Sequence, residues 1–323
     1  MEVRFDKGIY LPGPGLRLDP HGPHPQAVVS HAHSDHVQSH EEVLSTAATA
    51  ALMRRRGVTR PRFRTLPFGA PTQVGEARVT LFPAGHVLGS AQVLVEWEGT
   101  RLLYSGDFKL RPNRTAEPIQ IPEADEVIME TTFGRSHYRL PPTAEVEDRI
   151  RRFCRQALVD GCCPVLFCYS LGKGQEVLAL LEGEAYPIYL QQEHWLTTAL
   201  YRELGVSLPP HRRFQPGQKL DGVLLCAMGC RKAAWFARLG EVRTAYLSGW
   251  AMDRNALYRN RTDAAFPLSD HADYPELLEY VERTGARRIH TIHGFSERFA
   301  ADLRLRGYWA EPLREPSAQL TLF

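Results

Sequence analysis

Three histidines and one aspartate lie within six positions near the amino terminus, in the segment His31-Ala32-His33-Ser34-Asp35-His36. The short apolar run before Ser30 is typical of a strand. If the extended backbone continues past Ser30, His31 and His33 point to the same side, and Asp35 and His36 follow in the turn. Imidazole and carboxylate groups at this density suit Zn²⁺ or Mn²⁺ rather than a metal that prefers thiolates. The segment therefore predicts a metal site.

Side chains of the same kinds follow later apolar runs that we expect to be strands. These runs lie at 78–82, 92–97, 102–104, 127–129 and 289–292, and the second and third are expected to form a hairpin around Gly99. Single polar residues come soon after them, namely His86, Asp107, Glu130 and His293. His271 precedes a predicted amphipathic helix. Because loops at strand ends converge on one edge of a sheet, we expect these residues to share one site.

The composition is that of an ordinary globular protein. The chain has 323 residues, of which 43% are hydrophobic and 24% are charged. It contains no apolar stretch long enough to span a membrane, and its charged amino terminus lacks the apolar core of a signal peptide. The six cysteines lie mostly in apolar runs and are expected to be reduced core thiols. We therefore expect a cytoplasmic protein with no membrane partner.

The basic residues are unusual in kind, because only five of the 39 are lysines. Genomic codon bias is the simplest explanation of the arginine excess. Two local clusters are nevertheless plausible contacts to a phosphate backbone, because guanidinium groups bind phosphate through paired hydrogen bonds. The first has six arginines within eleven positions and no acidic residue among them, and the second has three: Arg54, Arg55, Arg56, Arg60, Arg62 and Arg64, then Arg254, Arg259 and Arg261.

The spacing of His31, His33, Asp35 and His36, followed by His86, Asp107 and a distal histidine, resembles the metallo-β-lactamase superfamily. Glu130, Asp270-His271-Ala272-Asp273 and Ile292-His293-Gly294 further resemble its β-CASP branch of nucleic-acid nucleases. Within that branch, Pro83-Ala84-Gly85-His86-Val87-Leu88-Gly89-Ser90-Ala91-Gln92 is similar to the bacterial ligase-associated DNA exonuclease group, relatives of the SNM-type DNA-repair nucleases. The resemblance extends from about residue 5 to about residue 310.

The resemblance implies an α/β fold in which an αββα metallo-β-lactamase sandwich is interrupted by an inserted α/β β-CASP domain. The sandwich would comprise 1–138 and 262–323, and the insert 139–261. The insert sequence agrees with this, since predicted strands at 165–168, 188–190, 223–226 and 245–247 alternate with helices around 147–158, 175–181 and 196–204. Such alternation predicts a parallel sheet. The carboxyl-terminal segment 317–323 is expected to be a short strand or a loose tail.

The resemblance also implies the role of each residue. His31, His33 and His86 would hold one divalent ion, and Asp35, His36 and His293 the other, with Asp107 bridging the two. The ions would be Zn²⁺, with Mn²⁺ as the alternative. Two ions about 3.5–4 Å apart activate water and neutralise charge on a phosphate.

Four acidic or basic residues would support this centre. His271 would contact the scissile phosphate or protonate the leaving group, and Glu130 would orient it. Asp35 is a further catalytic candidate. Asp19 matches an early aspartate of the family and would buttress the ligands, although an aspartate before a proline is also typical of a plain turn.

A loop in the insert carries the expected substrate contacts. In the SNM-type relatives a matching serine and lysine hold the terminal 5′ phosphate, which makes Ser170, Gly172 and Lys173 substrate-binding candidates. The start of the following helix would offer free backbone N–H groups to an anion. The alternative is an ordinary strand-to-helix turn in which the glycines supply backbone freedom.

The expected function is a binuclear-metal exodeoxyribonuclease that digests single-stranded DNA, or DNA with a free end, from 5′ to 3′ during repair. The name of the similar group implies a functional link to a DNA ligase or helicase. A β-CASP ribonuclease acting on RNA is the alternative. A small-molecule metallo-hydrolase is disfavoured by Glu130, His271 and the insert, and an inactive scaffold is disfavoured because all seven expected ligands are present.

Overall fold

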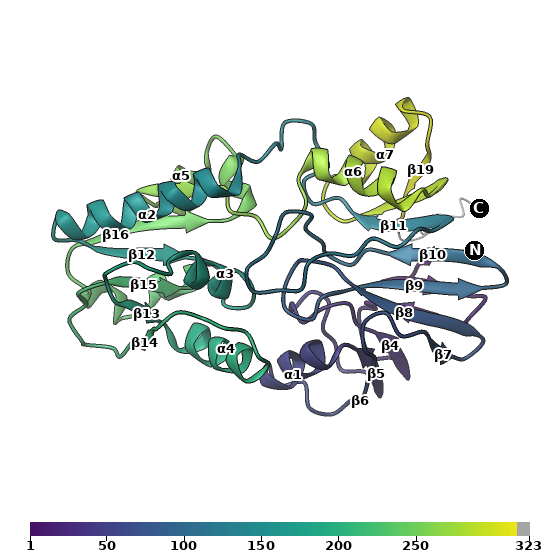
Figure 1. The fold of residues 1–323 in the computed structure, drawn as a ribbon, viewed down its shortest axis with the longest axis horizontal. Coiled ribbons are helices and arrows are strands. Elements are labelled where there is room, and N and C mark those ends of the chain that lie inside the picture. The colour runs from purple at the N-terminus through teal and green to yellow at the C-terminus, as the bar shows by residue number, and fades with distance from the viewer. Residues whose placement is uncertain (315–323) are drawn as a thin grey trace, which may run out of the picture. The chain divides into compact units, whose positions relative to one another are not determined.

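The computed structural model describes residues 1–314, which fall into two compact units (Figure 1). The first unit comprises 1–112, 117–138 and the chain from 271 onward, and the second comprises 113–116 and 139–270. The chain thus returns to the first unit at 271 rather than at the expected 262. The reason is that β17 (Ala264–Phe266) pairs with β16 (Val242–Leu247) in the second unit. The predicted strand or tail at 317–323 lies outside the described residues.

The first unit contains two sheets. Its amino-terminal sheet has the order β1-β2-β3-β4-β5-β6, antiparallel from β1 to β3 and parallel from β3 to β6. These strands are β1 (Arg4–Phe5), β2 (Ile9–Leu11), β3 (Leu16–Leu18), β4 (Gln26–Val28), β5 (Glu42–Ser45) and β6 (Arg62–Thr65).

The central sheet has the order β19-β18-β11-β10-β9-β8-β7. Its strands are β7 (Thr72–Val74), β8 (Ala77–Pro83), β9 (Ala91–Trp97), β10 (Thr100–Tyr104), β11 (Glu126–Glu130), β18 (Arg288–Ile292) and β19 (Trp309–Pro312). The predicted hairpin is confirmed: β9 and β10 are antiparallel, and Glu98 and Gly99 between them both have positive φ. That left-handed turn matches the twist of the paired strands.

Apolar residues from the facing sides of the two sheets form a single buried cluster, to which Leu11 and Leu44 contribute from one sheet and Val93 and Ile128 from the other. The opposite side of the central sheet is covered by α6 (Tyr274–Thr284) and α7 (Ser296–Leu305), which bury a second cluster. Helix α1 (Ala47–Arg55) contacts β6. The predicted α/β class is therefore confirmed.

The second unit is built on a six-stranded sheet of order β14-β13-β15-β12-β16-β17, and every pairing in it is parallel, as predicted. Helices connect the successive strands except β14 and β15, which are joined by a loop, and such long connections are what parallel pairing requires. The remaining strands are β12 (Cys163–Phe167), β13 (Ile188–Leu190), β14 (Arg212–Arg213) and β15 (Val223–Cys226). The helices are α2 (Thr143–Val159), α3 (Lys173–Leu180), α4 (Gln192–Glu203), α5 (Ala256–Asn260), η1 (Met228–Lys232), η2 (Phe236–Arg238) and η3 (Gly249–Met252).

The beginning of α6 is sharply defined, and it determines where the preceding segment lies. The Asp273 carboxylate accepts the N–H of Glu276, and the Glu276 side chain accepts the N–H of Asp273 in return. This reciprocal capping box fixes the helix start two residues after His271.

In the described chain no helix is both long and apolar enough to cross a membrane. All six cysteines are free and four are buried, as expected.

A buried amide joins α6 to the central sheet and allows a test of this packing. The Tyr280 hydroxyl donates to Gln92 Oε1 at 2.7 Å, and Gln92 Nε2 donates to the carbonyls of Pro83 and Gln120. Tyr280→Phe removes the one hydrogen bond that Gln92 Oε1 accepts within residues 1–314, and it should lower the free energy of unfolding by about 1–3 kcal/mol in urea denaturation. Tyr308→Phe is the control, and equal stability of the two variants would contradict the expectation.

Candidate metal centre

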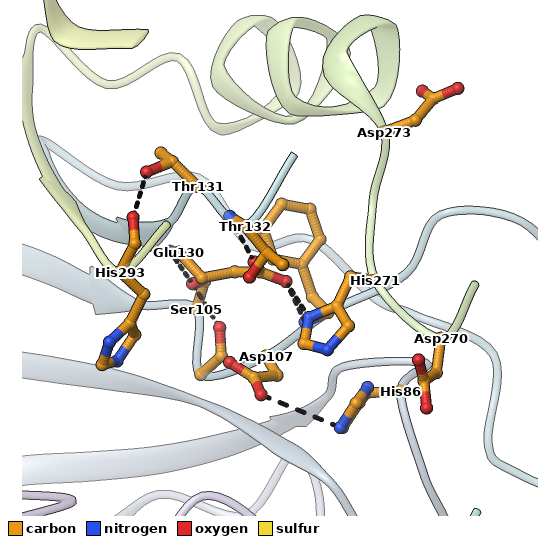
Figure 2. A network of polar contacts seen from close by, with 12 residues as sticks. His86, Ser105, Asp107, Glu130, Thr131, Thr132, Asp270, His271, Asp273 and His293 are labelled. Carbon is orange, nitrogen blue, oxygen red and sulfur yellow. Dashed lines mark hydrogen bonds and ion pairs between the residues drawn. The ribbon is translucent and has the colours of Figure 1, made fainter. Parts of the chain in front are cut away.

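The carboxylate of Asp107 lies at the centre of the histidine cluster. Asp107 follows β10 and is buried, and its Oδ2 lies 3.5 Å from His31 Nε2 and 3.5 Å from His36 Nε2. His86 Nε2 approaches the same oxygen at 3.9 Å (Figure 2). Burial raises the pKa of Asp107, but the imidazoles of His36 and His271 outweigh it and hold the pKa well below its usual range. The carboxylate is therefore ionised and faces several imidazole nitrogens.

The first predicted ligand set is gathered in one place. Donor atoms of His31, His33, His86 and Asp107 all lie within 4.8 Å of one another. His31 Nε2 is buried without a hydrogen-bond partner, and burial lowers the pKa of His31 well below its usual value. An unpaired buried nitrogen costs about 1–3 kcal/mol, a cost that coordination of a cation would remove. The donor types and this orphaned nitrogen fit a divalent metal.

The second predicted set is less closely gathered. His36 Nε2 lies 3.7 Å from Asp35 Oδ2, and the rings of His36 and His293 are 5.8 Å apart. Asp35 and His293 are exposed. Within residues 1–314 these three side chains do not form a group of donors as close as the first set, although His36 does so with Asp19 and His31.

Asp19 is a supporting residue rather than a plain turn aspartate. Although φ is positive at this residue, as in many turns, its buried carboxylate accepts hydrogen bonds from the Ser30 N–H and hydroxyl and from the Tyr104 hydroxyl. Asp19 Oδ2 also lies 2.8 Å from His36 Nδ1. This contact turns the other ring nitrogen, Nε2, toward Asp107, and a carboxylate behind a histidine is the common way of orienting a metal ligand.

Close approaches of the backbone bring the ligand-bearing loops together. A side chain on Gly106, which has φ +54°, would lie 2.9 Å from Ser30 Cβ, so only glycine allows the Asp107 loop to pass the His31 loop this closely. Gly294 is similarly close to the Thr131 carbonyl, and the Thr131 hydroxyl donates to the His293 carbonyl at 2.7 Å (Figure 2). The position of each ligand therefore depends on a neighbouring loop from another strand.

Glu130 and His271 form a separate pair beside this cluster. His271 Nδ1 lies 2.8 Å from Glu130 Oε1 (Figure 2). Glu130 is fully buried and also accepts the backbone N–H groups of Phe108 and Thr132, at 3.3 and 3.0 Å. The rings of His271 and His86 are 4.9 Å apart. The pair is thus held rigidly, with His271 in contact range of the first ligand set.

The loop predicted to bind a terminal phosphate lies in the second unit. Lys173 is buried, and its Nζ is 3.4 Å from both Glu176 and Asp270. The expectation of free backbone N–H groups is wrong for three positions, because Gly172 donates to the Gln175 side chain and Lys173 and Gly174 donate to the carbonyls of Leu171 and Tyr169. Ser170 is partly exposed.

Sequence reasoning missed several hydroxyl groups that support the site. The sequence predicts Tyr104 only as the end of a strand, yet its hydroxyl is buried and donates to Asp19. Burial and the Asp19 carboxylate both raise the pKa of Tyr104, so the hydroxyl keeps its proton and remains a donor. Ser105 Oγ accepts the Glu130 N–H, and Ser30 Oγ lies 3.0 Å from His31 Nδ1. The available signal was the polar tip of a tyrosine at an inward-facing strand position, next to a ligand.

Comparisons with known proteins agree with the ligand pattern. No family model matches the chain. A protein from Opitutus terrae named probable DNA ligase is 49% identical over 313 residues, which cover 96% of this chain and 31% of that protein. Endoribonuclease ysh1 from Aspergillus fumigatus is 34% identical over 127 residues, 38% of this chain and 14% of ysh1. Transcription termination factor FttA from Thermococcus kodakarensis is 32% identical over 162 residues, 47% of this chain and 25% of FttA.

The chain spans less than a third of the length of each of these relatives. The matches to ysh1 and FttA support the resemblance to the metallo-β-lactamase superfamily. A crystal structure of a protein of unknown function from Enterococcus faecalis V583 has a TM-score of 0.61 and 14% identity, covering 90% of this chain and 79% of that one. It shows a likeness of fold alone. Together with the His and Asp clusters, the relatives support binding of a divalent metal.

The contacts of Asp19 predict an effect on metal affinity without loss of a ligand. Asp19→Asn weakens the acceptor that orients His36 and should lower affinity for Zn²⁺ about 10–100-fold in a chelator competition assay. The control is Asp6→Asn, which alters an exposed carboxylate paired with Arg17. Equal affinity in the two variants would show that Asp19 has no supporting role.

Proposed function

We propose that this chain is a β-CASP nuclease that uses divalent metal ions to hydrolyse phosphodiester bonds of DNA from a free end, in the cytoplasm. The observation that carries the proposal is the pair Glu130–His271, held next to Asp107 at the edge of the buried histidine cluster. The cluster supplies a metal site, and the pair supplies a positioned imidazole for the reacting phosphate. In this proposal the first unit is the metallo-β-lactamase sandwich and the second is the β-CASP domain.

The proposed metal complement is two ions, with Zn²⁺ first and Mn²⁺ as the alternative. One ion would be held by His31, His33 and His86 and the other by Asp35, His36 and His293, with Asp107 shared. Bound there, the ions would neutralise the developing charge on the phosphate and make water a stronger nucleophile. Burial lowers the pKa of His31, and the imidazoles of His36 and His271 lower the pKa of Asp107, which favours the uncharged imidazole and the ionised carboxylate that ligands need at these two positions.

The protein side chains would handle the protons. Because Glu130 engages Nδ1 of His271, the remaining ring nitrogen, Nε2, is the one left to hold a proton for the leaving sugar oxygen or to contact the phosphate. The backbone N–H groups of Phe108 and Thr132 keep Glu130 in position while this happens. Asp35 is exposed beside His36 and is the candidate to accept a proton from the attacking water.

DNA is the preferred substrate because one match covers nearly the whole chain and lies in a protein named for DNA ligation. That match also supports a functional link between the proposed nuclease and a DNA ligase. The alternative substrate is RNA, which the match to an endoribonuclease favours over part of the chain.

We propose Ser170, Gly172 and Lys173 as contacts to a 5′ phosphate, which would make digestion run from 5′ to 3′. Since Lys173 is paired with Glu176 and Asp270, the phosphate would share that ammonium with two carboxylates. Ser170 is partly exposed and has a hydroxyl to donate. Ser170→Ala is therefore the cleaner variant, because removal of Lys173 would leave two carboxylates without their cation.

The substrate is tested by digesting matched DNA and RNA strands labelled at the 5′ end, the 3′ end or internally, with a 5′ phosphate or a 5′ hydroxyl. The expected result is release of mononucleotides from the 5′ end of DNA, faster with a 5′ phosphate, and loss of that preference in Ser170→Ala. Cuts in the middle of RNA would establish the ribonuclease alternative. Digestion from the 3′ end would overturn the assignment of the loop.

His271 is not one of the predicted metal ligands. Its replacement should therefore give a protein that is folded and carries metal but has a low kcat. His271→Ala should retain the metal content of the wild type, measured by elemental analysis, and lose on the order of 10²–10⁴ in kcat on DNA. His21→Ala changes an exposed histidine outside the site and serves as the control. A metal-depleted His271→Ala protein would reassign His271 as a ligand.

A further inference from the structure

Arginine side chains along the chain commonly form ion pairs with carboxylates. Examples are Arg78 with Glu96 at 2.8 Å, Arg111 with Glu276 at 2.6 Å and Arg155 with Glu184 at 2.7 Å. Such pairs neutralise the charge of the arginine locally and weaken its electrostatic attraction for a polyanion. A cluster that lacks them is therefore distinctive in this protein.

One such cluster lies at the end of α1 and along β6. We call it the arginine ridge, and it consists of Arg54, Arg56, Arg60, Arg62 and Arg64, all of which are exposed. Among the residues that the structure describes, Arg62 forms an ion pair with Glu42, and Arg64 also helps to hold the pKa of that carboxyl below its usual value. No aspartate or glutamate occurs from residue 43 to residue 75. The five arginines therefore outnumber the carboxylates beside them, and the ridge presents an excess of positive charge.

The local structure explains part of the ridge but not its charge balance. Arg54 lies 4.3 Å from the ring centroid of Phe63, and arginines in the last turn of α1 favour the negative pole of the helix. β6 is the edge strand of its sheet, where charged side chains discourage pairing with another chain. Neither role requires neighbouring carboxylates to be absent.

The ridge is tied to the candidate metal centre within the first unit. The hydroxyls of Thr46 and Thr49, at the start of α1, both donate to the Gly89 carbonyl, at 2.7 and 2.9 Å. Gly89 lies in the loop that carries His86. The nine residues of α1 extend about 13 Å at 1.5 Å per residue, so the ridge begins about that far from the loop. At 3.4 Å per stacked nucleotide this is a span of about four nucleotides.

We infer that the arginine ridge binds the phosphates of the DNA strand about four nucleotides from the scissile bond. This inference rests on the proposed function for its choice of partner. Arg62 and Arg64 project to the same side of β6, about 6.6 Å apart, which is a suitable repeat for successive phosphates of one strand. Guanidinium groups contact phosphate oxygens through two N–H groups at once, and a contact to phosphate is independent of the base sequence.

The test compares three triple variants made in the His271→Ala background, so that DNA persists during binding. In R54Q/R56Q/R60Q three cations are lost, and in R54K/R56K/R60K they are kept. R283Q/R287Q/R298Q removes three exposed arginines, from α6, from the residue before β18 and from α7. Binding of a labelled single-stranded DNA is measured by anisotropy at several salt concentrations. The slope of log Kd against log salt should become less steep by about two in the Gln variant, at about 0.7 per phosphate contact, and remain unchanged in the other two.

A kinetic comparison with His271 intact separates this inference from the proposed function. On a long DNA strand the Gln variant should raise KM at least about tenfold, whereas hydrolysis of bis(p-nitrophenyl) phosphate and of a dinucleotide, which cannot reach the ridge, should be unchanged. An unchanged salt slope in the Gln variant, or an equal change of slope in the α6–α7 control, would overturn the inference that the ridge binds DNA. A wild-type protein that hydrolyses none of the substrates would overturn the proposed function, and the binding slope would still decide the ridge.

Discussion

The structure of the first unit depends on accommodating one buried carboxylate. Removing an ionised carboxylate from water costs several kcal/mol unless opposite charge and hydrogen bonds replace the solvent. At Asp107 the replacement is a group of three imidazoles from two separate loops, and no single strand could supply them. This requirement explains why a glycine is needed at position 106, where two loops approach closely. It also explains why the Asp19 carboxylate contacts His36 Nδ1 and fixes the orientation of that ring.

The same arrangement divides the chemistry between two groups of residues. Asp19 accepts hydrogen bonds from both sheets of the first unit, since Ser30 follows β4 and Tyr104 ends β10. It therefore links the positions of the two sheets to the position of a ligand. Glu130 does the equivalent for His271, but through backbone N–H groups of its own sheet. The predicted metal ligands and the Glu130–His271 pair are thus positioned by different hydrogen bonds, and both adjoin Asp107.

Charge is distributed differently in the two places expected to meet phosphate. In the loop before α3 the cation is buried and shared between two carboxylates, which makes it a selective contact that an anion must compete for. The arginine ridge is exposed and carries an excess of positive charge, which suits a contact that forms and breaks as a strand advances. Together they would combine recognition of an end with sequence-independent retention of the strand.

The sequence by itself determined the α/β class, the hairpin at Gly99, the parallel sheet of the second unit and the full bounds of β13 and β15, because alternating and continuous apolar runs report local backbone structure directly. It also identified the imidazoles and carboxylates that meet around Asp107. Tertiary structure alone decided which groups donate to Asp19 and which partners the hydroxyls of Tyr104 and Ser105 meet. It also decided that the chain re-enters the first unit at residue 271, and that the backbone N–H groups before α3 bond within their own loop. These features arise where residues far apart in the chain come into contact, and register, loop geometry and burial, rather than local pattern, determine which donor meets which acceptor.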